Sequence, residues 1–212
     1  RRRKSSMWLA CEAAAQGRAD TVISAGNTGA LLAISMFAMR MVEGAHRPAL
    51  ASFLPTSRGE TVMLDLGANL ECDAENLSEF SVMGSVFAQV LLGLDKPKVG
   101  LLNVGSEELK GHEELRVAAA RLRAENSPVN FHGFVEGNDI GTGLVDVIVT
   151  DGFTGNIALK SIEGTAKLYT SFVRDAFRTS TFAKIGYLFA SGAWTKLRTR
   201  VDPRRYNGGV FL

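Results

Sequence analysis

The chain has 212 residues, 46% of them hydrophobic, and its 24 Arg and Lys against 22 Asp and Glu leave a net charge of +2. This length suits one well-buried domain, and no apolar run reaches the ~18 residues of a membrane span. Two cysteines are too few for a disulfide framework or a four-ligand zinc site. These totals favour a cytosolic enzyme or binding domain over a membrane protein or a disulfide-rich secreted protein.

The charge is unevenly distributed along the chain. Arg1–Lys4 contribute +4, Arg174–Arg205 contribute a net +6, and the segment between them therefore carries −8. Basic ends around an acidic middle predict an acidic partner surface, a membrane or nucleic acid as the partner. Solvated surface charge is the alternative.

Strand-like runs alternate with helix-like patterns along the chain. Strands are expected at Thr21–Ala25, Ala49–Leu54, Thr61–Leu66, Lys98–Val104, Val129–Val135 and Asp146–Thr150. Helices are expected at Thr28–Val42, Ala74–Leu92, Glu113–Glu125 and Gly155 to about Phe177. Most of these strands are apolar on both faces, as in a sheet covered on two sides. The prediction is a single α/β domain over residues 1–212, with a doubly wound, mainly parallel sheet.

One pair of strands breaks this alternation. Only a short stretch that includes Pro55–Gly59 separates the run Ala49–Leu54 from the run Thr61–Leu66. Such a connection cannot hold a crossover helix, so this pair is predicted to be an antiparallel hairpin inserted in the parallel sheet.

Four predicted strand ends carry glycine and short polar residues before a helix. They are ISAGNTGA (Ile23–Ala30), LDLGANLE (Leu64–Glu71), LNVGSEELKG (Leu102–Gly111) and VTDGFTGN (Val149–Asn156). Open α/β sheets bind ligands at the carboxyl ends of their strands, and unpaired N–H groups at a helix start favour an anion. We expect the four loops to form one anion-binding crevice. For any one loop alone, an ordinary turn with a helix cap is the alternative.

The usual sequence signatures of cofactors, metals and nucleophiles are not met. No Walker motif and no GxGxxG fingerprint is found, so ATP or NAD binding is not supported. The residue four positions after His112 is an arginine, so the two-histidine zinc spacing fails, and His46 and His132 stand alone. Cys11 fits helix packing, and Cys72 lacks a neighbouring histidine that would make it a nucleophile. The sequence predicts no cofactor and no metal.

What remains is a site rich in hydrogen-bond donors and poor in nucleophiles. The substrate-binding candidates are Gly26, Asn27, Thr28, Gly29, Asn69, Asn103, Ser106, Asp151, Thr154 and Gly155, together with Lys110 and Asn156. Such a site suits a reaction whose nucleophile is a substrate. Inorganic phosphate qualifies, because it is an anion that a lysine and helix starts can hold and it can attack an activated carbonyl.

These motifs resemble bacterial phosphate acyltransferase, the PlsX family, which makes acyl phosphate from acyl carrier protein thioester and inorganic phosphate. The runs that carry the resemblance are ISAGNTGAL, RPAL, LDLGAN, MGSVFA, VGLLNVGSEELKG, VTDGFTGNIALK with IEGTA, and YNGGVFL. The resemblance implies a Rossmann-like α/β/α fold related to phosphotransacetylases and isopropylmalate-type dehydrogenases. It also implies a homodimer and a place at the start of phospholipid synthesis in the cytoplasm.

By the same resemblance, the catalytic lysine is Lys110 in SEELKG and the catalytic asparagine is Asn156 in DGFTGN. Lys110 would hold phosphate or the carbonyl oxygen, and Asn156 would orient the reactants, although the two roles could be exchanged. The alternatives are a surface lysine and a simple helix N-cap. Family members begin with a strand and a Gly-Gly-Asp turn that is not found before Arg1, so the chain is expected to be a fragment of the complete enzyme.

Residues 177–205 form a predicted amphipathic helical segment within the domain. Its membrane-facing candidates are Phe182, Ile185, Leu188, Phe189 and Trp194. Apolar residues flanked by Arg and Lys fit an anionic bilayer surface, and the resemblance implies peripheral association through a helical hairpin at the inner face of the cell membrane. A dimer contact or core packing is the alternative. The acidic carrier protein could instead bind this segment or Arg1–Lys4, and no nucleic-acid partner is expected.

The sequence therefore predicts an acyltransferase that moves a long-chain fatty acyl group from acyl carrier protein to inorganic phosphate. One alternative is a short-chain phosphotransacetylase that uses coenzyme A thioesters. A second is a non-enzymatic module that docks to a membrane or to carrier protein. The aromatic segment favours the lipid substrate.

Overall fold

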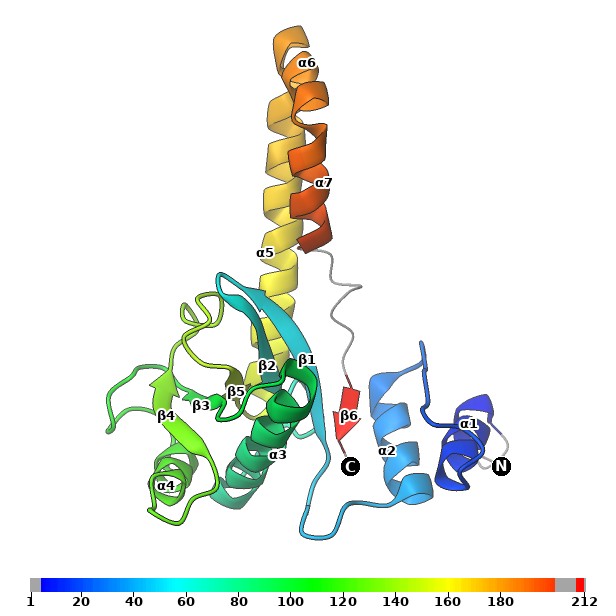
Figure 1. Cartoon of the computed structure of the whole chain (residues 1–212), viewed down its shortest axis with the longest axis vertical. Helices are drawn as coiled ribbons and strands as arrows, with labels where there is room; N and C mark the ends of the chain where they lie inside the picture. The colour runs from blue at the N-terminus through cyan, green and yellow to red at the C-terminus, as the bar shows by residue number, and fades with distance from the viewer. Residues whose placement is uncertain (1–4, 201–208, 212) are drawn as a thin grey trace.

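A computed structural model describes residues 5–200 and 209–211 of the chain. Within these residues one sheet lies between helices, and a long helical projection stands above it (Figure 1). The strands are β1 (Ala49–Thr56), β2 (Gly59–Leu64), β3 (Lys98–Leu102), β4 (Asn130–Val135), β5 (Val147–Val149) and β6 (Gly209–Phe211). The helices are α1 (Ser6–Ala15), α2 (Thr28–Met39), α3 (Ala74–Leu92), α4 (Glu113–Leu122), α5 (Gly152–Arg178), α6 (Thr181–Phe189) and α7 (Ser191–Arg200). The basic stretch Arg1–Lys4 and residues 201–205 of the predicted amphipathic segment lie outside the described residues.

The strand order is β4-β3-β5-β2-β1-β6. The first four strands in this order run parallel, while β1 is antiparallel to both of its neighbours. From β2 the chain crosses through α3 to β3, continues through α4 to β4, and then returns to place β5 between β3 and β2. The prediction of a mainly parallel α/β sheet is confirmed. The carboxyl ends of β2, β5 and β3 are therefore neighbours at one edge.

The predicted antiparallel hairpin is β1 and β2. Its strands extend further than the apolar runs, because Pro55 pairs with Glu60 and Thr56 pairs with Gly59. Ser57 and Arg58 alone form the turn. β1 extends the sheet beyond β2, and β6 pairs with the free edge of β1.

Both faces of the sheet are covered, which explains why its strands are apolar without alternation. Leu64 and Val149 point to the face packed by α3 and α4, where Phe80 is fully buried. Met63 and Ile148 point to the other face, where Ala158 and Leu159 from the start of α5 pack. Alternate residues of a strand face opposite sides, so two separate apolar layers form.

The predicted strand at Thr21–Ala25 is wrong. This segment has no regular secondary structure, and Ile23 is 92% exposed. It connects α1 to α2, and these two helices pack on each other beside the β6 side of the sheet (Figure 1). A short apolar run becomes a strand only where another strand pairs with its backbone. Of the four polar loops expected to follow strands, the one at Ile23–Ala30 follows no strand, and the other three do.

The helix boundaries refine the sequence prediction at one important point. α5 begins at Gly152 rather than at Gly155, and Asp151 is its N-cap. The alternative reading of Asn156 as a simple N-cap is therefore wrong. Asn156 lies in the second turn of the helix, where its side chain is free to face a neighbouring loop.

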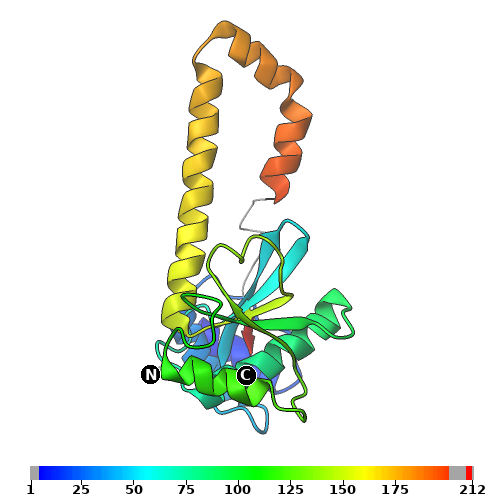
Figure 2. The same cartoon turned by 90° about the vertical axis from the view of Figure 1, so that its left-hand side faces the viewer.

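The helices α5, α6 and α7 form a projection away from the sheet. The 27-residue α5 rises beyond the body, and α6 and α7 return toward it (Figures 1 and 2). An aromatic cluster holds the turn together, because Phe177 lies 5.4 Å from Tyr187 and 5.2 Å from Trp194 between ring centroids. Trp194 is thus half-buried inside the projection.

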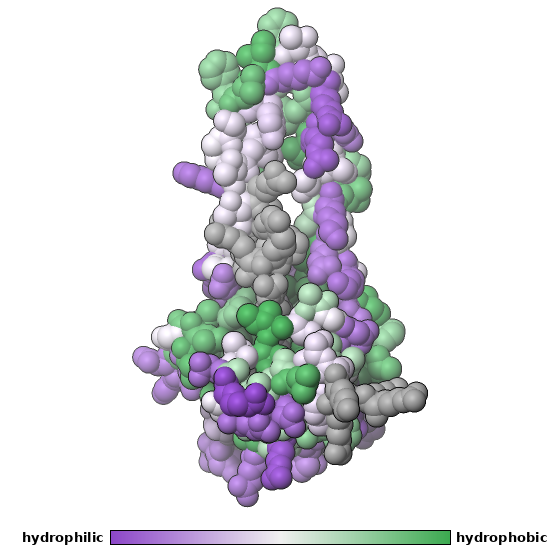
Figure 3. Space-filling model, turned by 90° about the vertical axis from the view of Figure 1, so that its right-hand side faces the viewer, coloured by the Kyte–Doolittle hydropathy of each residue, from purple (hydrophilic) through white to green (hydrophobic). Residues whose placement is uncertain are grey.

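Hydrophobic residues gather at the far end of the projection (Figure 3). Phe182 is 87% exposed, Leu188 70%, and Phe189 89%, while Ile185 is 46% exposed. Among the described residues, no helix combines the length and apolar composition needed to cross a bilayer.

Candidate active site

Three polar loops emerge side by side from the parallel strands. The loop after β2 begins at Asp65, the loop after β5 begins at Thr150, and the loop after β3 begins at Asn103. Because β5 lies between β2 and β3, its loop stands between the other two. This is the sheet edge at which open α/β folds bind their ligands.

Asp65 organises the loop after β2. Its side chain is fully buried. The Oδ1 atom accepts hydrogen bonds from the backbone N–H groups of Leu50 at 3.0 Å, Gly67 at 3.2 Å and Ala68 at 2.9 Å. The Oδ2 atom accepts from the backbone N–H of Asn69 at 2.7 Å and from its Nδ2 at 2.9 Å. This carboxylate therefore holds the backbone of the loop in one conformation and joins the loop to β1.

Asn69 links the loop after β2 to two other segments. Its Nδ2 also donates to the Pro48 carbonyl at 2.7 Å, and its own carbonyl accepts from the Gly152 N–H at 2.7 Å. Both hydrogens of the Asn69 amide are thus used inside the protein. Its backbone N–H and carbonyl also have partners, Asp65 and Gly152. As a substrate-binding residue Asn69 therefore stays a prediction.

The start of α5 packs directly on this loop. A Cβ at Gly152 would lie 2.5 Å from the Asn69 carbonyl oxygen, and one at Gly155 would overlap the carbonyl oxygen of Asp65. Across this contact the Asn156 side chain lies next to Gly67, 3.7 Å from the Cβ position built there. The two glycines of α5 therefore allow the close approach that sets Asn156 beside the loop.

Most amide groups at the start of α5 already have partners. The Gly152 N–H is bonded to Asn69, the Thr154 N–H donates to Asp151 Oδ1 at 2.8 Å, and the Gly155 N–H donates to the Asp151 carbonyl. The Thr154 hydroxyl also donates to Asp151 Oδ2 at 2.7 Å. The carboxylate of Asp151 thus occupies the place at this helix start where we expected a bound anion.

The loop after β3 carries Lys110 and is closed by Asn103. The buried side chain of Asn103 donates from Nδ2 to the Lys110 carbonyl at 3.0 Å and accepts at Oδ1 from the Val104 N–H at 2.8 Å. Gly111 has a φ of 86°, and a Cβ there would overlap the Asn103 amide. Asn103 therefore has a structural role in positioning Lys110.

The Lys110 ammonium forms an ion pair with Glu107. Its Nζ lies 2.7 Å from Glu107 Oε1, and the Lys110 side chain is 51% exposed. The hydrogen bond and charge of Glu107 raise the pKa of Lys110, and Lys110 in turn lowers the pKa of Glu107. Lys110 is therefore a cation at neutral pH. Ser106 lies exposed in the same loop.

The helix that follows Lys110 has an open start. The N-cap of α4 is His112, which makes no side-chain capping hydrogen bond. The first N–H groups of α4 thus have no side-chain acceptor, unlike those of α3 and α5. Of the two helix starts that follow the candidate loops at β3 and β5, the one beside Lys110 has the less occupied N–H groups, and its first turn also carries Glu113 and Glu114.

The remaining candidates lie elsewhere in the fold. Gly26, Asn27, Thr28 and Gly29 precede and begin α2, and Asn27 caps that helix by accepting from the Ala30 N–H at 2.9 Å. No described strand delivers this loop to the sheet edge. The structure therefore brings together the loops with Asn69, Asn103, Lys110 and Asn156, and it does not join the α2 loop to them through the sheet.

Lys110 and Asn156 come from adjacent loops but do not touch. They follow neighbouring strands, β3 and β5, and among the described residues neither side chain hydrogen-bonds to the other. The exposed Asn156 amide makes no hydrogen bond to any described residue. Both groups are thus available to a ligand.

Sequence reasoning missed two residues of this edge. Asp65 organises the loop, and Glu107 holds Lys110. An acid immediately after a buried strand and a Glu three residues before a Lys were the available signals. The sequence does not identify the partners of Asp65, because they include the distant β1 backbone. The spacing of Glu107 and Lys110 allows an ion pair but does not show that it forms.

A three-layer α/β fold with polar loops at the carboxyl ends of its parallel strands defines the class of this protein, and solved structures share the fold. A phosphotransacetylase from Streptococcus pyogenes is 16% identical with a TM-score of 0.61, covering 76% of this chain and 55% of that chain. A branched-chain phosphotransacylase from Enterococcus faecalis is 18% identical with a TM-score of 0.57, covering 74% and 63%. Identities this low establish the fold alone.

The chain belongs to the fatty acid synthesis protein family, whose sequence profile matches residues 1–212. The phosphate acyltransferase of Paramagnetospirillum magneticum is 60% identical over 99% of this chain and 60% of the relative. That of Rhodospirillum centenum is 64% identical over 99% of this chain and 59% of the relative. The chain spans about 60% of the length of these relatives. The resemblance inferred from the sequence motifs is confirmed.

The contact between α5 and Asp65 can be tested with two glycine substitutions. Gly155→Ala should lower the free energy of unfolding by about 1–3 kcal/mol, because the added methyl overlaps backbone. Gly164→Ala is the control, since Gly164 lies in the same helix with nothing within 4 Å. It should raise stability by up to about 1 kcal/mol through helix propensity. Equal stabilisation by both changes in urea denaturation would contradict this packing.

The reactivity of Cys72 tests the site in another way. Burial, followed by the charges of Asp65 and Asp151, raises the pKa of the Cys72 thiol to about 12. The thiol should therefore stay protonated at pH 8 and react slowly with a disulfide reagent. We expect native protein to show little labelling of Cys72 until denaturant is added. Rapid native labelling of Cys72, mapped by mass spectrometry, would show a thiolate and reopen a nucleophilic role.

Proposed function

We propose that this protein transfers a long-chain fatty acyl group from acyl carrier protein to inorganic phosphate, giving acyl phosphate for phospholipid synthesis. The similarity to relatives named phosphate acyltransferase over nearly the whole chain carries this proposal. The donor-rich edge supports it, because the adjacent loops after β3 and β5 offer a cation and an amide, and the edge has no reactive thiol.

The reaction needs no nucleophile from the protein. A phosphate oxygen attacks the thioester carbonyl carbon, a C–O bond forms, the C–S bond breaks, and the carrier thiolate leaves and takes up a proton. The protein must hold two reactants in register and stabilise the negative charge on the carbonyl oxygen. Fixed hydrogen-bond donors at a sheet edge suit both tasks.

Lys110 is assigned to phosphate in this proposal. Its ammonium stays charged at neutral pH, and it stands just before α4, whose first N–H groups lack a side-chain cap. A lysine and an open helix start together favour an anion. The start of α5 is the weaker place, because the Asp151 carboxylate already takes its amide groups.

Asn156 is assigned to the carbonyl oxygen. Its amide is exposed on the second turn of α5, beside Gly67 of the loop that Asp65 holds. A donor on a rigid helix satisfies the main requirement of an oxyanion contact, which is to be in place before charge develops.

The natural full-length protein should convert palmitoyl carrier protein and phosphate into acyl phosphate that hydroxylamine traps. Asn156→Ala should lower kcat by roughly 10²–10³-fold, as expected for a lost oxyanion donor. Lys110→Ala should mainly raise KM for phosphate. Lys160→Ala is the control, because Lys160 is an exposed residue of α5 paired with Glu163, and it should change neither constant.

Each alternative function has its own outcome in this assay. Faster turnover of acetyl coenzyme A than of palmitoyl carrier protein would identify a short-chain phosphotransacetylase. No acyl phosphate from the intact protein, with vesicle binding retained, would identify a docking module. Full activity of the Lys110→Ala variant would contradict the role given to Lys110.

Peripheral membrane association is the second part of the proposal. Phe182, Leu188 and Phe189 are exposed on α6 at the far end of the projection. Lys184 lies in the same helix, and apolar residues beside basic ones bind anionic lipid surfaces. The protein would then work in the cytoplasm at the inner face of the membrane, where its lipid product is used.

A homodimer and carrier-protein binding complete the proposal. Within the projection, α5 exposes the side chains of Leu168, Tyr169 and Phe172. A second copy of the chain would cover these residues. Acidic carrier protein would approach the basic residues of the projection. Arg1–Lys4, the other basic stretch, lies outside the described residues.

Vesicle flotation tests the membrane contact. Replacing both Phe182 and Phe189 by Ser should weaken binding to phosphatidylglycerol vesicles by about tenfold or more per residue, since burying a Phe contributes about 1.5–3 kcal/mol. Val90→Ser is the matched control, because Val90 is 73% exposed on α3 in the body of the protein. Equal loss of binding in both variants would place the membrane contact elsewhere.

A further inference from the structure

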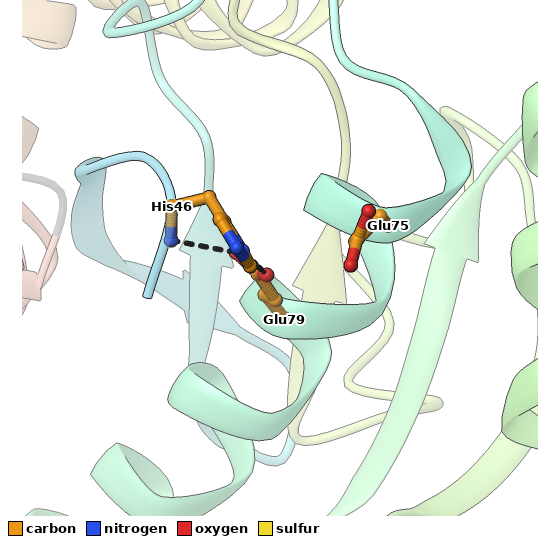
Figure 4. A group of neighbouring side chains, drawn as sticks. All are labelled: His46, Glu75 and Glu79. Carbon is orange, nitrogen blue, oxygen red and sulfur yellow. Dashed lines mark hydrogen bonds and ion pairs between the residues drawn. The ribbon is translucent and has the colours of Figure 1, made fainter. Parts of the chain in front are cut away.

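Three potential metal ligands meet on the surface near the start of α3. His46 lies in the segment before β1, and Glu75 and Glu79 lie one turn apart on α3 (Figure 4). One ligand atom from each of the three side chains lies within 4.8 Å of the others. The sequence expectation that His46 stands alone is therefore wrong, because the fold supplies both carboxylates.

His46 and Glu79 hold each other in place. The His46 backbone N–H donates to Glu79 Oε2 at 3.1 Å, and its ring Nδ1 pairs with Glu79 Oε1. Two contacts from one residue to one carboxylate fix the direction of the imidazole. Glu79 is only 16% exposed, whereas the His46 side chain is 65% exposed, so the pair is anchored on one side and open to solvent on the other.

No lysine or arginine of the described residues neutralises the carboxylates of this cluster. Within residues 5–200 and 209–211, no Lys or Arg side chain forms an ion pair with Glu75 or Glu79. The nearby Arg47 guanidinium donates to the Glu71 carbonyl at 3.2 Å. These negative charges act on the imidazole of His46. Its pKa is raised mainly by Glu79 and further by Glu75 and Asp73.

We propose that His46, Glu75 and Glu79 bind a divalent transition metal ion, with Zn²⁺ the best suited, and that water completes its coordination. One imidazole nitrogen and two carboxylate oxygens are ligands that zinc accepts. The imidazole disfavours Mg²⁺ and Ca²⁺, which prefer oxygen ligands alone. The ion would replace the proton between Nδ1 and Glu79 and neutralise the excess charge.

The geometry needs only a small adjustment. Tetrahedral zinc with bonds of about 2.1 Å holds its ligand atoms about 3.4 Å apart. The ligand atoms here are at most 4.8 Å apart, and Glu75 is an exposed, flexible side chain one helical turn from Glu79. Metal binding would therefore need a rotation of Glu75 toward the pair, and it would also need Nδ1 of His46 and Oε1 of Glu79 to move apart from their hydrogen-bond contact.

The bound ion would have a structural role and would take no part in a reaction. Two residues after His46, the Pro48 carbonyl accepts a hydrogen bond from Asn69 in the loop after β2. A bound ion would tie this segment to α3 and so brace the Asp65 loop from outside. The inference does not depend on the proposed acyl transfer.

The test is a calorimetric titration of the natural full-length protein, without an affinity tag and after dialysis against a chelator, with Zn²⁺. We expect saturable binding that weakens at least tenfold in His46→Gln and in Glu79→Gln. His132→Gln and Glu114→Gln, which change an exposed histidine and an exposed glutamate outside the cluster, should bind like the parent protein. Co²⁺ absorption spectra should show the same pattern among the variants.

The melting temperature gives a second, independent readout. Zn²⁺ should raise it in the parent protein and in His132→Gln, and Mg²⁺ at the same concentration should not. Circular dichroism will establish that the cluster variants are folded. Equal Zn²⁺ affinity in the parent and His46→Gln proteins, or no saturable binding up to millimolar Zn²⁺, would overturn the inference. The contact between His46 and Glu79 would then be only an ion pair.

Discussion

The fully buried carboxylate of Asp65 joins segments that are distant in the sequence. Burying an ion costs several kcal/mol unless hydrogen bonds compensate, and here the backbone of β1, the backbone of the following loop and the Asn69 side chain all donate to it. Asn69 then extends the network to Pro48 and to the start of α5. Without this carboxylate, several buried N–H groups would lose their acceptor.

The two residues proposed for catalysis are held with different rigidity. Asn156 belongs to a helix whose glycines Gly152 and Gly155 touch the backbone of the Asp65 loop, so its position follows from close packing. Lys110 lies on an exposed loop, closed by Asn103 and restrained by a single ion pair to Glu107. A fixed donor suits a charge that develops in the transition state. A movable cation suits a phosphate that must enter and leave.

A single helix connects the sheet edge with the projection. α5 begins against the Asp65 loop and ends at the aromatic cluster below α6. At 1.5 Å per residue its 27 residues span about 40 Å. The apolar tip is therefore remote from the candidate active site and yet attached to it by one continuous, stiff element. Such an arrangement would keep the proposed reaction in the body of the protein and leave the tip available to a membrane or a partner.

Local patterns in the sequence determined much of this architecture. The apolar runs with short polar ends predicted the parallel sheet and its candidate loops, and α3 has the bounds that its pattern predicts, Ala74–Leu92. The short connection after β1 predicted the hairpin. The sheet, the helix and the hairpin could be predicted because they depend on side-chain periodicity, turn residues and chain length. The catalytic roles of Lys110 and Asn156 came from the family resemblance and stay a prediction.

Only the tertiary structure decided which residues meet. Thr21–Ala25 has the composition of a strand but no strand beside it, and an isolated His46 in the sequence lies against two glutamates of α3. Asp65 is an ordinary acid in the sequence, and it becomes the centre of a buried network because β1 passes next to it. Backbone pairing, burial and charge proximity depend on segments far apart along the chain, and a local pattern contains no information about those distances.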